Sequence, residues 1–102
     1  MSVVVVATIV PKSEHREEVI AAFRDTIAQV HGEDGCELYA LHEAPDRLII
    51  VEKWASPEAL SAHGEGAAIS ALNPRLAGKV ARPPEIIVTQ PVAAGDPAKG
   101  QL

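Results

Sequence analysis

The stretch GCELYALHEAPDRLIIVEKWASPEALSAH, from Gly35 to His63, carries the clearest structural signals in the chain. It predicts a strand over Cys36–Glu43, a tight turn over residues 44–47, and a second strand that begins at Leu48. The turn contains a proline, which presets φ for its second position, and an aspartate, which accepts local backbone hydrogen bonds. The sequence therefore predicts a β-hairpin in the middle of the chain.

The hairpin leads into a short helix. Leu48–Val51 is a continuous apolar run, as in a strand buried on both faces, and Trp54 closes that strand. Ser56 is a typical N-cap and Pro57 suits the first helical position. We expect the helix to run from Pro57 to His63, because glycines at positions 64 and 66 interrupt it.

A strand and a long helix precede the hairpin. Four consecutive valines open a strand over Val3–Val10, because their stiff side chains favour extended structure. A helix with one apolar stripe follows, from an N-cap at Ser13 to about His31. Gly32 is predicted to end this helix in the left-handed conformation.

The chain after the hairpin completes one domain. Residues 67–76 have a helical pattern in which Pro74 is predicted to cause a kink or a break near Asn73, and residues 85–90 form the last strand. The order β-α-β-β-α-β predicts an α+β, ferredoxin-like fold, an antiparallel four-stranded sheet with helices on one face. We expect residues 1–91 to form this domain and residues 92–102 to be a mobile C-terminal tail.

The apolar pattern of the strands predicts a homodimer. Successive residues are apolar in Val3–Val6 and in Leu48–Val51, so both faces of the sheet carry apolar side chains. Two helical segments cover only one face, and apolar surface left in water forfeits about 25 cal/mol per Å². A domain of this size is stable by only about 5–15 kcal/mol, so we expect a second copy to cover the other face.

Composition narrows the classes of function. Fourteen acidic against nine basic residues give a net charge of −5, which argues against a nucleic-acid binder. The single cysteine, Cys36, cannot form an internal disulfide and is most simply a small buried residue. The apolar run at residues 3–10 is too short to span a bilayer and lacks the flanks of a signal peptide. We expect a cytoplasmic protein without membrane contact.

The sequence carries no motif for a cofactor. It has no glycine-rich phosphate loop, no Cys-x-x-Cys, no HExxH and no nucleophile elbow, and its four histidines are too scattered to predict a metal site. His63 is the candidate for chemistry, because imidazole at the end of a short helix could accept a proton near neutral pH. It could equally satisfy the last carbonyls of its helix. By strand period, His42 shares a face with Cys36, Leu38 and Ala40, and either points into a pocket or packs as a core histidine.

Three aromatic residues could shape a binding pocket. Tyr39 has the opposite strand parity to His42, so its ring could line a cavity or fill an interface. Trp54 is either a hydrophobic anchor between sheet and helix or a flat wall for an aromatic ligand. Phe23 belongs to the apolar stripe of the first helix. Glu52 shares the parity of Trp54 and could orient a histidine or pair with a neighbouring base.

The central stretch resembles a known family. The patterns Gly-Cys-x-x-Tyr-x-Leu-His, Glu-x-Trp-x-Ser and Leu-x-x-His are similar to those of the antibiotic biosynthesis monooxygenases, which are small dimeric α+β barrel proteins. The matching positions are Gly35, Cys36, Tyr39, Leu41, His42, Glu52, Trp54, Ser56, Leu60 and His63. The resemblance covers about a third of the chain, and the order of the flanking elements agrees with it over residues 3–90.

The resemblance implies an activity. Oxygenases of this family oxidise a quinol or a hydroxylated polycyclic aromatic with O₂, without metal or flavin. It implies His63 as the proton acceptor and a substrate pocket shaped by Trp54, Tyr39, His42 and Phe23. Many relatives carry a second histidine five residues beyond His63, where this chain has Ala68.

Other activities occur on the same fold. Haem-degrading relatives place a Trp and a His at the spacing of Trp54 and His63, but they also have a first-strand Asn where this chain has Ala7. The alternatives are therefore a haem-binding or haem-degrading protein and a non-catalytic dimeric module for small molecules. Isomerisation of a phosphorylated sugar-like compound would need clustered basic residues, and Arg47, Arg75 and Arg82 are scattered along the sequence.

Overall fold

The computed structural model describes all 102 residues. Its elements in chain order are β1 (Val3–Ile9), a 3₁₀ turn (Ser13–His15), α1 (Arg16–Val30), β2 (Cys36–Ala44), β3 (Arg47–Trp54), α2 (Pro57–Gly64), α3 (Ala67–Leu76) and β4 (Glu85–Thr89). Every predicted strand and helix is present, within a few residues of its predicted bounds. None of the helices combines the length and the apolar character that crossing a membrane requires.

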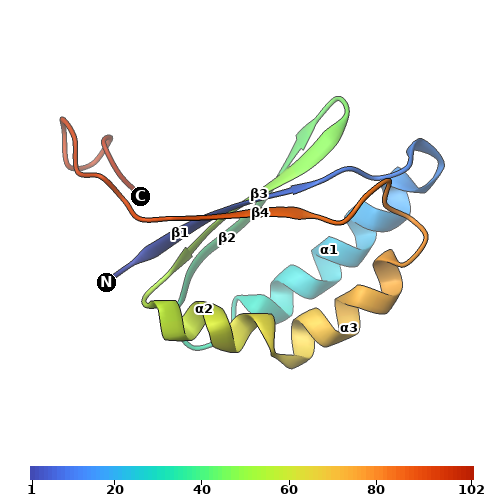
Figure 1. Ribbon diagram of the computed structural model, residues 1–102, viewed down its shortest axis with the longest axis horizontal. Helices are drawn as coiled ribbons and strands as arrows, with labels where there is room; N and C mark the ends of the chain where they lie inside the picture. The colour runs from blue at the N-terminus through green and yellow to red at the C-terminus, as the bar shows by residue number, and fades with distance from the viewer.

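The four strands form one antiparallel sheet in the order β2-β3-β1-β4. All three helices lie against the same face of this sheet, and α2 and α3 follow one another along it (Figure 1). This arrangement confirms the predicted α+β, ferredoxin-like fold. It also leaves the second face of the sheet without any helical cover.

The core lies between the sheet and the helices. In β1 the residues alternate, with Val3, Val5, Ala7 and Ile9 buried and the residues between them partly exposed. The register pairs these buried positions with the buried residues of β3, so both strands present the same face to the helices. The helices pack against this face of the sheet through buried apolar residues, most of them spaced by three or four. These are Val19, Ile20, Phe23 and Val30 of α1 and Ala68, Leu72 and Leu76 of α3.

The opposite side of the sheet carries a second apolar surface, which we call the far face. The strand register places on it Val4, Val6, Leu38, Ala40, Ile49, Val51 and Ile87. Val6 lies at its centre, paired with Val51 on one side and Ile87 on the other. These side chains are partly or largely exposed in the single chain, so they form an apolar surface that no segment of the same chain covers.

Three local predictions were wrong. The long helix does not begin with a Ser13 cap, because residues 13–15 form a 3₁₀ turn and α1 begins at Arg16. The left-handed glycine after this helix is Gly35, with φ of 80°, and not Gly32. Pro74 does not break α3, because it lies in the last turn and the helix ends two residues later.

A β-bulge also changes the pattern of β2. The register slips between Cys36 and Leu38, so Cys36 faces the helices opposite Trp54 while Leu38, Ala40 and His42 lie on the far side. The prediction that Cys36 and His42 share a face was therefore wrong, because the bulge inserts one residue into the period of two. The prediction that Tyr39 has the opposite parity to His42 is confirmed.

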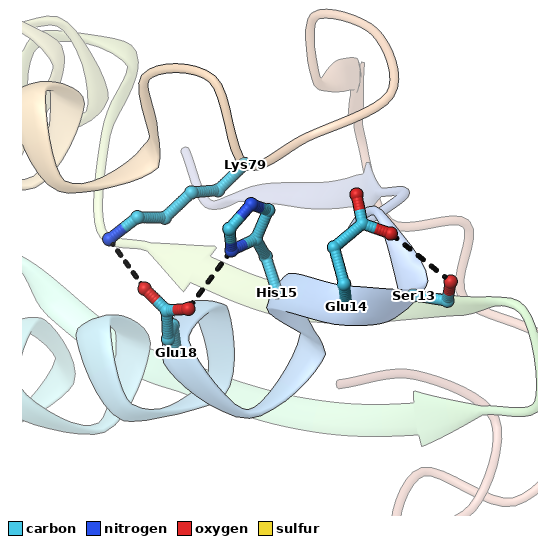
Figure 2. A network of polar contacts seen from close by, with 5 residues as sticks. All are labelled: Ser13, Glu14, His15, Glu18 and Lys79. Carbon is cyan, nitrogen blue, oxygen red and sulfur yellow. Dashed lines mark hydrogen bonds and ion pairs between the residues drawn. The ribbon is translucent and has the colours of Figure 1, made fainter.

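A polar network ties the connection before β4 to the start of α1. Glu18 of α1 accepts from Lys79 Nζ at 2.9 Å and contacts His15 Nδ1 at 2.9 Å, as Figure 2 shows. The backbone N–H of Lys12 also donates to the carbonyl of Lys79. These exposed ion pairs each contribute little to stability, but together they fix the path of the segment that leads into β4.

Candidate active site

A cavity of about 370 Å³ lies on the helix side of the sheet. Its walls are mostly apolar and include Val5, Ala7, Phe23, Leu72 and Ile86 from the strands β1 and β4 and the helices α1 and α3. Ligand pockets in proteins measure roughly 300–1,000 Å³, so this cavity is at the small end of the range. Four side chains with polar groups also line it, those of Tyr39, Glu52, His63 and Asn73.

The local sequence around α2 places His63 in this cavity. Ser56 caps α2, accepting a hydrogen bond from the backbone N–H of Ala59 at 3.1 Å, and Pro57 occupies the first turn. The helix is two turns long and ends at Gly64, so His63 lies in its last turn. The His63 side chain is only 7% exposed.

Glu33 holds the buried ring of His63. This residue lies in the turn between α1 and β2, and its Oε1 is 2.6 Å from His63 Nδ1. Gly35 makes this approach possible, because a side chain there would need a left-handed backbone and its Cβ would lie 2.5 Å from the Cβ of Ala59. Glu33 Oε2 also lies beside Gly66, which caps the N-terminus of α3, where the helix dipole favours a negative charge.

The contact with Glu33 assigns the proton on the His63 ring. A carboxylate oxygen accepts hydrogen bonds, so Nδ1 is the donor and Nε2 of the neutral ring is left as a proton acceptor. Nε2 makes no hydrogen bond within the chain, and no fully buried side-chain nitrogen or oxygen is left without a hydrogen-bond partner. Nε2 is therefore not fully buried. Because His63 lines the cavity, we infer that Nε2 is accessible from there.

Trp54 lies behind this histidine and does not line the cavity. Its ring is fully buried, and its centroid is 4.6 Å from that of His63 at an angle of 33°. Its indole Nε1 donates a hydrogen bond of 2.9 Å to Glu52 Oε1. Tyr39 completes the cluster, with its ring 5.4 Å from His63 and in a T-shaped contact with Trp54 at 6.4 Å.

Tyr39 and Glu52 form a cross-strand pair at the floor of the cavity. They lie directly opposite one another on β2 and β3, and both are about 95% buried. Burial raises the pKa of the Glu52 carboxyl, although the Trp54 hydrogen bond and the charge of His63 act in the other direction. Burial and the nearby carboxyl of Glu52 likewise raise the pKa of the Tyr39 hydroxyl well above its usual range. In both groups burial shifts the protonation equilibrium toward the neutral, proton-bearing form.

The structure brings together most of the predicted site residues. His63, Tyr39 and Phe23 line one cavity, and Trp54 packs directly behind His63. His42 does not join them, because it is exposed on the far side of the sheet, paired with Ile49. No group of three or more His, Cys, Asp or Glu side chains is arranged to hold a metal ion.

Sequence reasoning missed the role of Glu33. It lies 30 residues before His63 in a turn that carries no motif, so no spacing in the sequence links the two. Strand parity correctly predicts that Glu52 shares the face of Trp54. The partner of Glu52 is the indole N–H and not Lys53 or Arg47, because these two lie on the other face of β3 and contact Glu37 and Asp46.

Comparisons with known proteins agree on the family of this chain. A sequence model of the family described as antibiotic biosynthesis monooxygenase matches residues 2–75. No curated protein matches the sequence. A candidate antibiotic biosynthesis monooxygenase from Caulobacter crescentus is 27% identical, with a TM-score of 0.83 over 89% of this chain and 90% of that one.

Two further solved structures share the fold at lower identity. Rv0793 from Mycobacterium tuberculosis is 24% identical, with a TM-score of 0.86 over 94% of this chain and 100% of that one. A conserved protein from Methanosarcina mazei is 22% identical, with a TM-score of 0.83 over 88% of this chain and 92% of that one. At this level of identity the likeness shows the fold alone.

The raised pKa of Glu52 predicts a specific pH dependence of stability. The folded state holds this proton up to a higher pH than the unfolded state, so the wild type loses stability as pH rises from the ordinary glutamate range through the folded pKa. Glu52→Gln keeps an acceptor for the Trp54 N–H and cannot ionise. We expect the free energy of unfolding of Glu52→Gln, minus that of the wild type, to increase as pH rises above the ordinary glutamate range, and to level off once pH exceeds the folded pKa of Glu52.

Urea unfolding at each pH measures this difference. Glu17→Gln, at an exposed position of α1, is the control for the general loss of one negative charge. A difference between Glu52→Gln and wild type that stays constant with pH, or that falls as pH rises, would show that Glu52 is not held in its protonated form.

Proposed function

The chain belongs to the antibiotic biosynthesis monooxygenase family, and from this we propose that it oxidises a quinol or a hydroxylated polycyclic aromatic with O₂, without metal or flavin. One oxygen atom enters the substrate and the other leaves as water, and the deprotonated substrate supplies the electrons. The protein then has to bury the ring, orient it and accept a proton. The observation that carries the proposal is the cavity itself, apolar on most sides and lined by a histidine with an accessible ring nitrogen.

In this proposal His63 is the catalytic base. Its Nε2 takes the proton of a substrate hydroxyl, and the resulting anion reacts with O₂. Glu33 is a positioning residue, because its bond to Nδ1 fixes the ring and stabilises the imidazolium that forms. Phe23 and the apolar walls bind the rings of the substrate, and Trp54 supports His63 from behind.

Cavity volume and lining favour this function over haem binding. A volume of about 370 Å³ suits a ring system of modest size better than a macrocycle. Ala7, the position at which haem-degrading relatives carry a polar first-strand residue, lines the cavity here and offers no hydrogen bond to a ligand.

We also propose that two chains pair through the far face. Its central residues, Val6, Val51 and Ile87, are apolar, lie side by side and have no cover from their own chain. Burying these residues against a second copy would stabilise the protein, because removing apolar surface from water is favourable. Lys53 and Arg47 lie toward the ends of β3 on this face, which leaves the apolar residues in the middle.

We also propose a domain boundary, a mobile C-terminal tail and a cellular location. We propose that residues 1–91 form the folded domain, because β4, the last regular element, ends at Thr89. Residues 92–102 would then be a mobile tail without helix or strand. We place the protein in the cytoplasm on the grounds of its single cysteine.

Oxygen uptake with naphthoquinol tests the function. We expect His63→Ala to lower the enzymatic rate about a hundredfold or more, since a positioned general base contributes about 10²–10⁴-fold. His15→Ala, which removes a histidine outside the cavity, should keep the wild-type rate. The uptake of quinol in buffer alone is subtracted throughout, because quinols also react with O₂ unaided.

The other outcomes of this assay are informative. Equal rates in the wild type and His63→Ala would remove His63 from the mechanism. Binding of the quinol without enzymatic uptake would favour a non-catalytic binding module. A shift of the Soret band on addition of haem would favour the haem alternative.

Sedimentation tests the dimer. We expect the wild type to sediment as a dimer at micromolar concentration and Val51→Lys to sediment as a folded monomer, because a buried unpaired ammonium at the centre of the far face is costly. Ala28→Lys, on the exposed side of α1, is the matched control and should remain dimeric. A monomeric wild type would contradict the pairing.

A further inference from the structure

Two residues that line the cavity carry polar groups that proton abstraction by His63 does not use. These are the hydroxyl of Tyr39 and the second carboxyl oxygen of Glu52. We propose that both groups donate hydrogen bonds to the substrate oxygen that His63 deprotonates, an inference that rests on the proposed function. The site would then select a phenol, quinol or enol over a hydrocarbon ring of the same shape.

The hydrogen bond from Trp54 determines which Glu52 oxygen is free. Glu52 Oε1 accepts from the indole N–H at 2.9 Å, and Glu52 makes no other side-chain hydrogen bond. Glu52 is 4% exposed, yet no buried side-chain oxygen lacks a partner, so Oε2 must keep contact with accessible space. Because Glu52 lines the cavity, that space is the cavity.

The same contact determines which oxygen carries the proton in the neutral carboxyl that we propose. The oxygen that accepts from Trp54 acts as the carbonyl oxygen, so the acidic proton belongs on Oε2, from which it can form a hydrogen bond to a ligand in the cavity. The groups that face this carboxyl are Trp54 from its own strand, Tyr39 from β2 and His63 from α2. Burial outweighs the opposing effect of His63 and keeps the pKa of Glu52 raised.

Tyr39 provides a second donor at the same place. It lies directly opposite Glu52 across β2 and β3, and its ring is 5.4 Å from that of His63. Its backbone carbonyl accepts from His31 outside the cavity, and its hydroxyl has no partner within the chain. Its raised pKa, which the nearby Glu33 and Cys36 also support, keeps the proton on the hydroxyl.

Together the three side chains make one polar end in an otherwise apolar cavity. When His63 removes a proton from a substrate hydroxyl, negative charge develops on the oxygen that remains. Two neutral donors already in place stabilise that charge at little cost of reorganisation, and more strongly than in water because the site is buried. A tyrosine and a protonated carboxyl are a chemically sufficient pair for this task.

A matched pair of ligands tests the inference by binding alone. β-Naphthol and β-methylnaphthalene have nearly the same shape and differ in one hydroxyl group. The indole N–H signal of Trp54, the only tryptophan, reports binding to each in proton–nitrogen NMR titrations without O₂. We expect the wild type to bind β-naphthol about tenfold more tightly, since the polar end is left unpaired by the hydrocarbon.

Three variants separate the two donors from the rest of the site. Tyr39→Phe removes only the hydroxyl, and Glu52→Met removes the carboxyl at similar length. Each should lower the preference for β-naphthol roughly threefold to tenfold while leaving the affinity for β-methylnaphthalene within about twofold. Glu52→Gln is the rescue variant, because its amide can accept from Trp54 and donate into the cavity, and it should keep the wild-type preference.

The outcomes distinguish this inference from the proposed function. If both compounds bind and Tyr39→Phe and Glu52→Met keep the full preference, the two donors do not contact the substrate oxygen and this inference alone is overturned. If neither compound binds to the wild type, the proposed function fails and this inference fails with it. Circular dichroism of each variant confirms that it is folded, and Tyr39→Phe carries the test alone if Glu52→Met unfolds.

Discussion

The hydrogen bond between Glu33 and His63 joins the two parts of the chain on which the site depends. One partner lies in the turn that leads from α1 to β2, and the other lies at the end of α2. The bond is short because Gly35 lets the turn pass close to α2, where any larger residue would meet Ala59. The helix can end with a buried histidine because a carboxylate satisfies one ring nitrogen.

Burial of polar groups then determines the chemistry of the cavity. Glu52 and Tyr39 lie opposite one another on the buried face of the sheet, and each loses most of its contact with water. The cost of ionising them there raises the pKa of both groups, and in our proposal both donate hydrogen bonds to a ligand. Trp54 makes this arrangement stable, because its ring packs against His63 and its N–H satisfies Glu52. His63 and Glu52 are therefore held by contacts with Trp54, which does not line the cavity.

Much of the fold could be predicted from the sequence, because it depends on local signals. The valine run, the turn at Pro45 and the Ser56 cap each specify an element within a few residues, and their order limits the topology. Phe23 could be placed on the apolar stripe of α1 from the helical period, and Tyr39 on the face opposite to that of His42 from the strand period. For His63 the sequence indicated only a position at the end of a short helix. The position of His42 relative to Cys36 could not, because a β-bulge alters the period of β2 without any signal in composition.

The partners of the site residues depend on tertiary contacts that a linear pattern does not contain. Glu33 looks like an ordinary turn residue until the glycine two positions later brings it to the end of α2. A flat aromatic side chain such as that of Trp54 could form a pocket wall. Here it packs behind His63, because its large apolar ring is most stable when buried and its N–H donates a hydrogen bond to Glu52 there.

The ring nitrogen that carries the proton of His63 can be measured directly. A long-range proton–nitrogen NMR spectrum of the histidine rings at alkaline pH, assigned with His63→Asn, distinguishes the two neutral tautomers. The hydrogen bond to Glu33 predicts a proton on Nδ1, and a free Nε2 whose signal moves when β-naphthol is added while the other three histidines stay unchanged. A proton on Nε2, or a ligand that leaves the His63 signals unmoved, would contradict this account of the site.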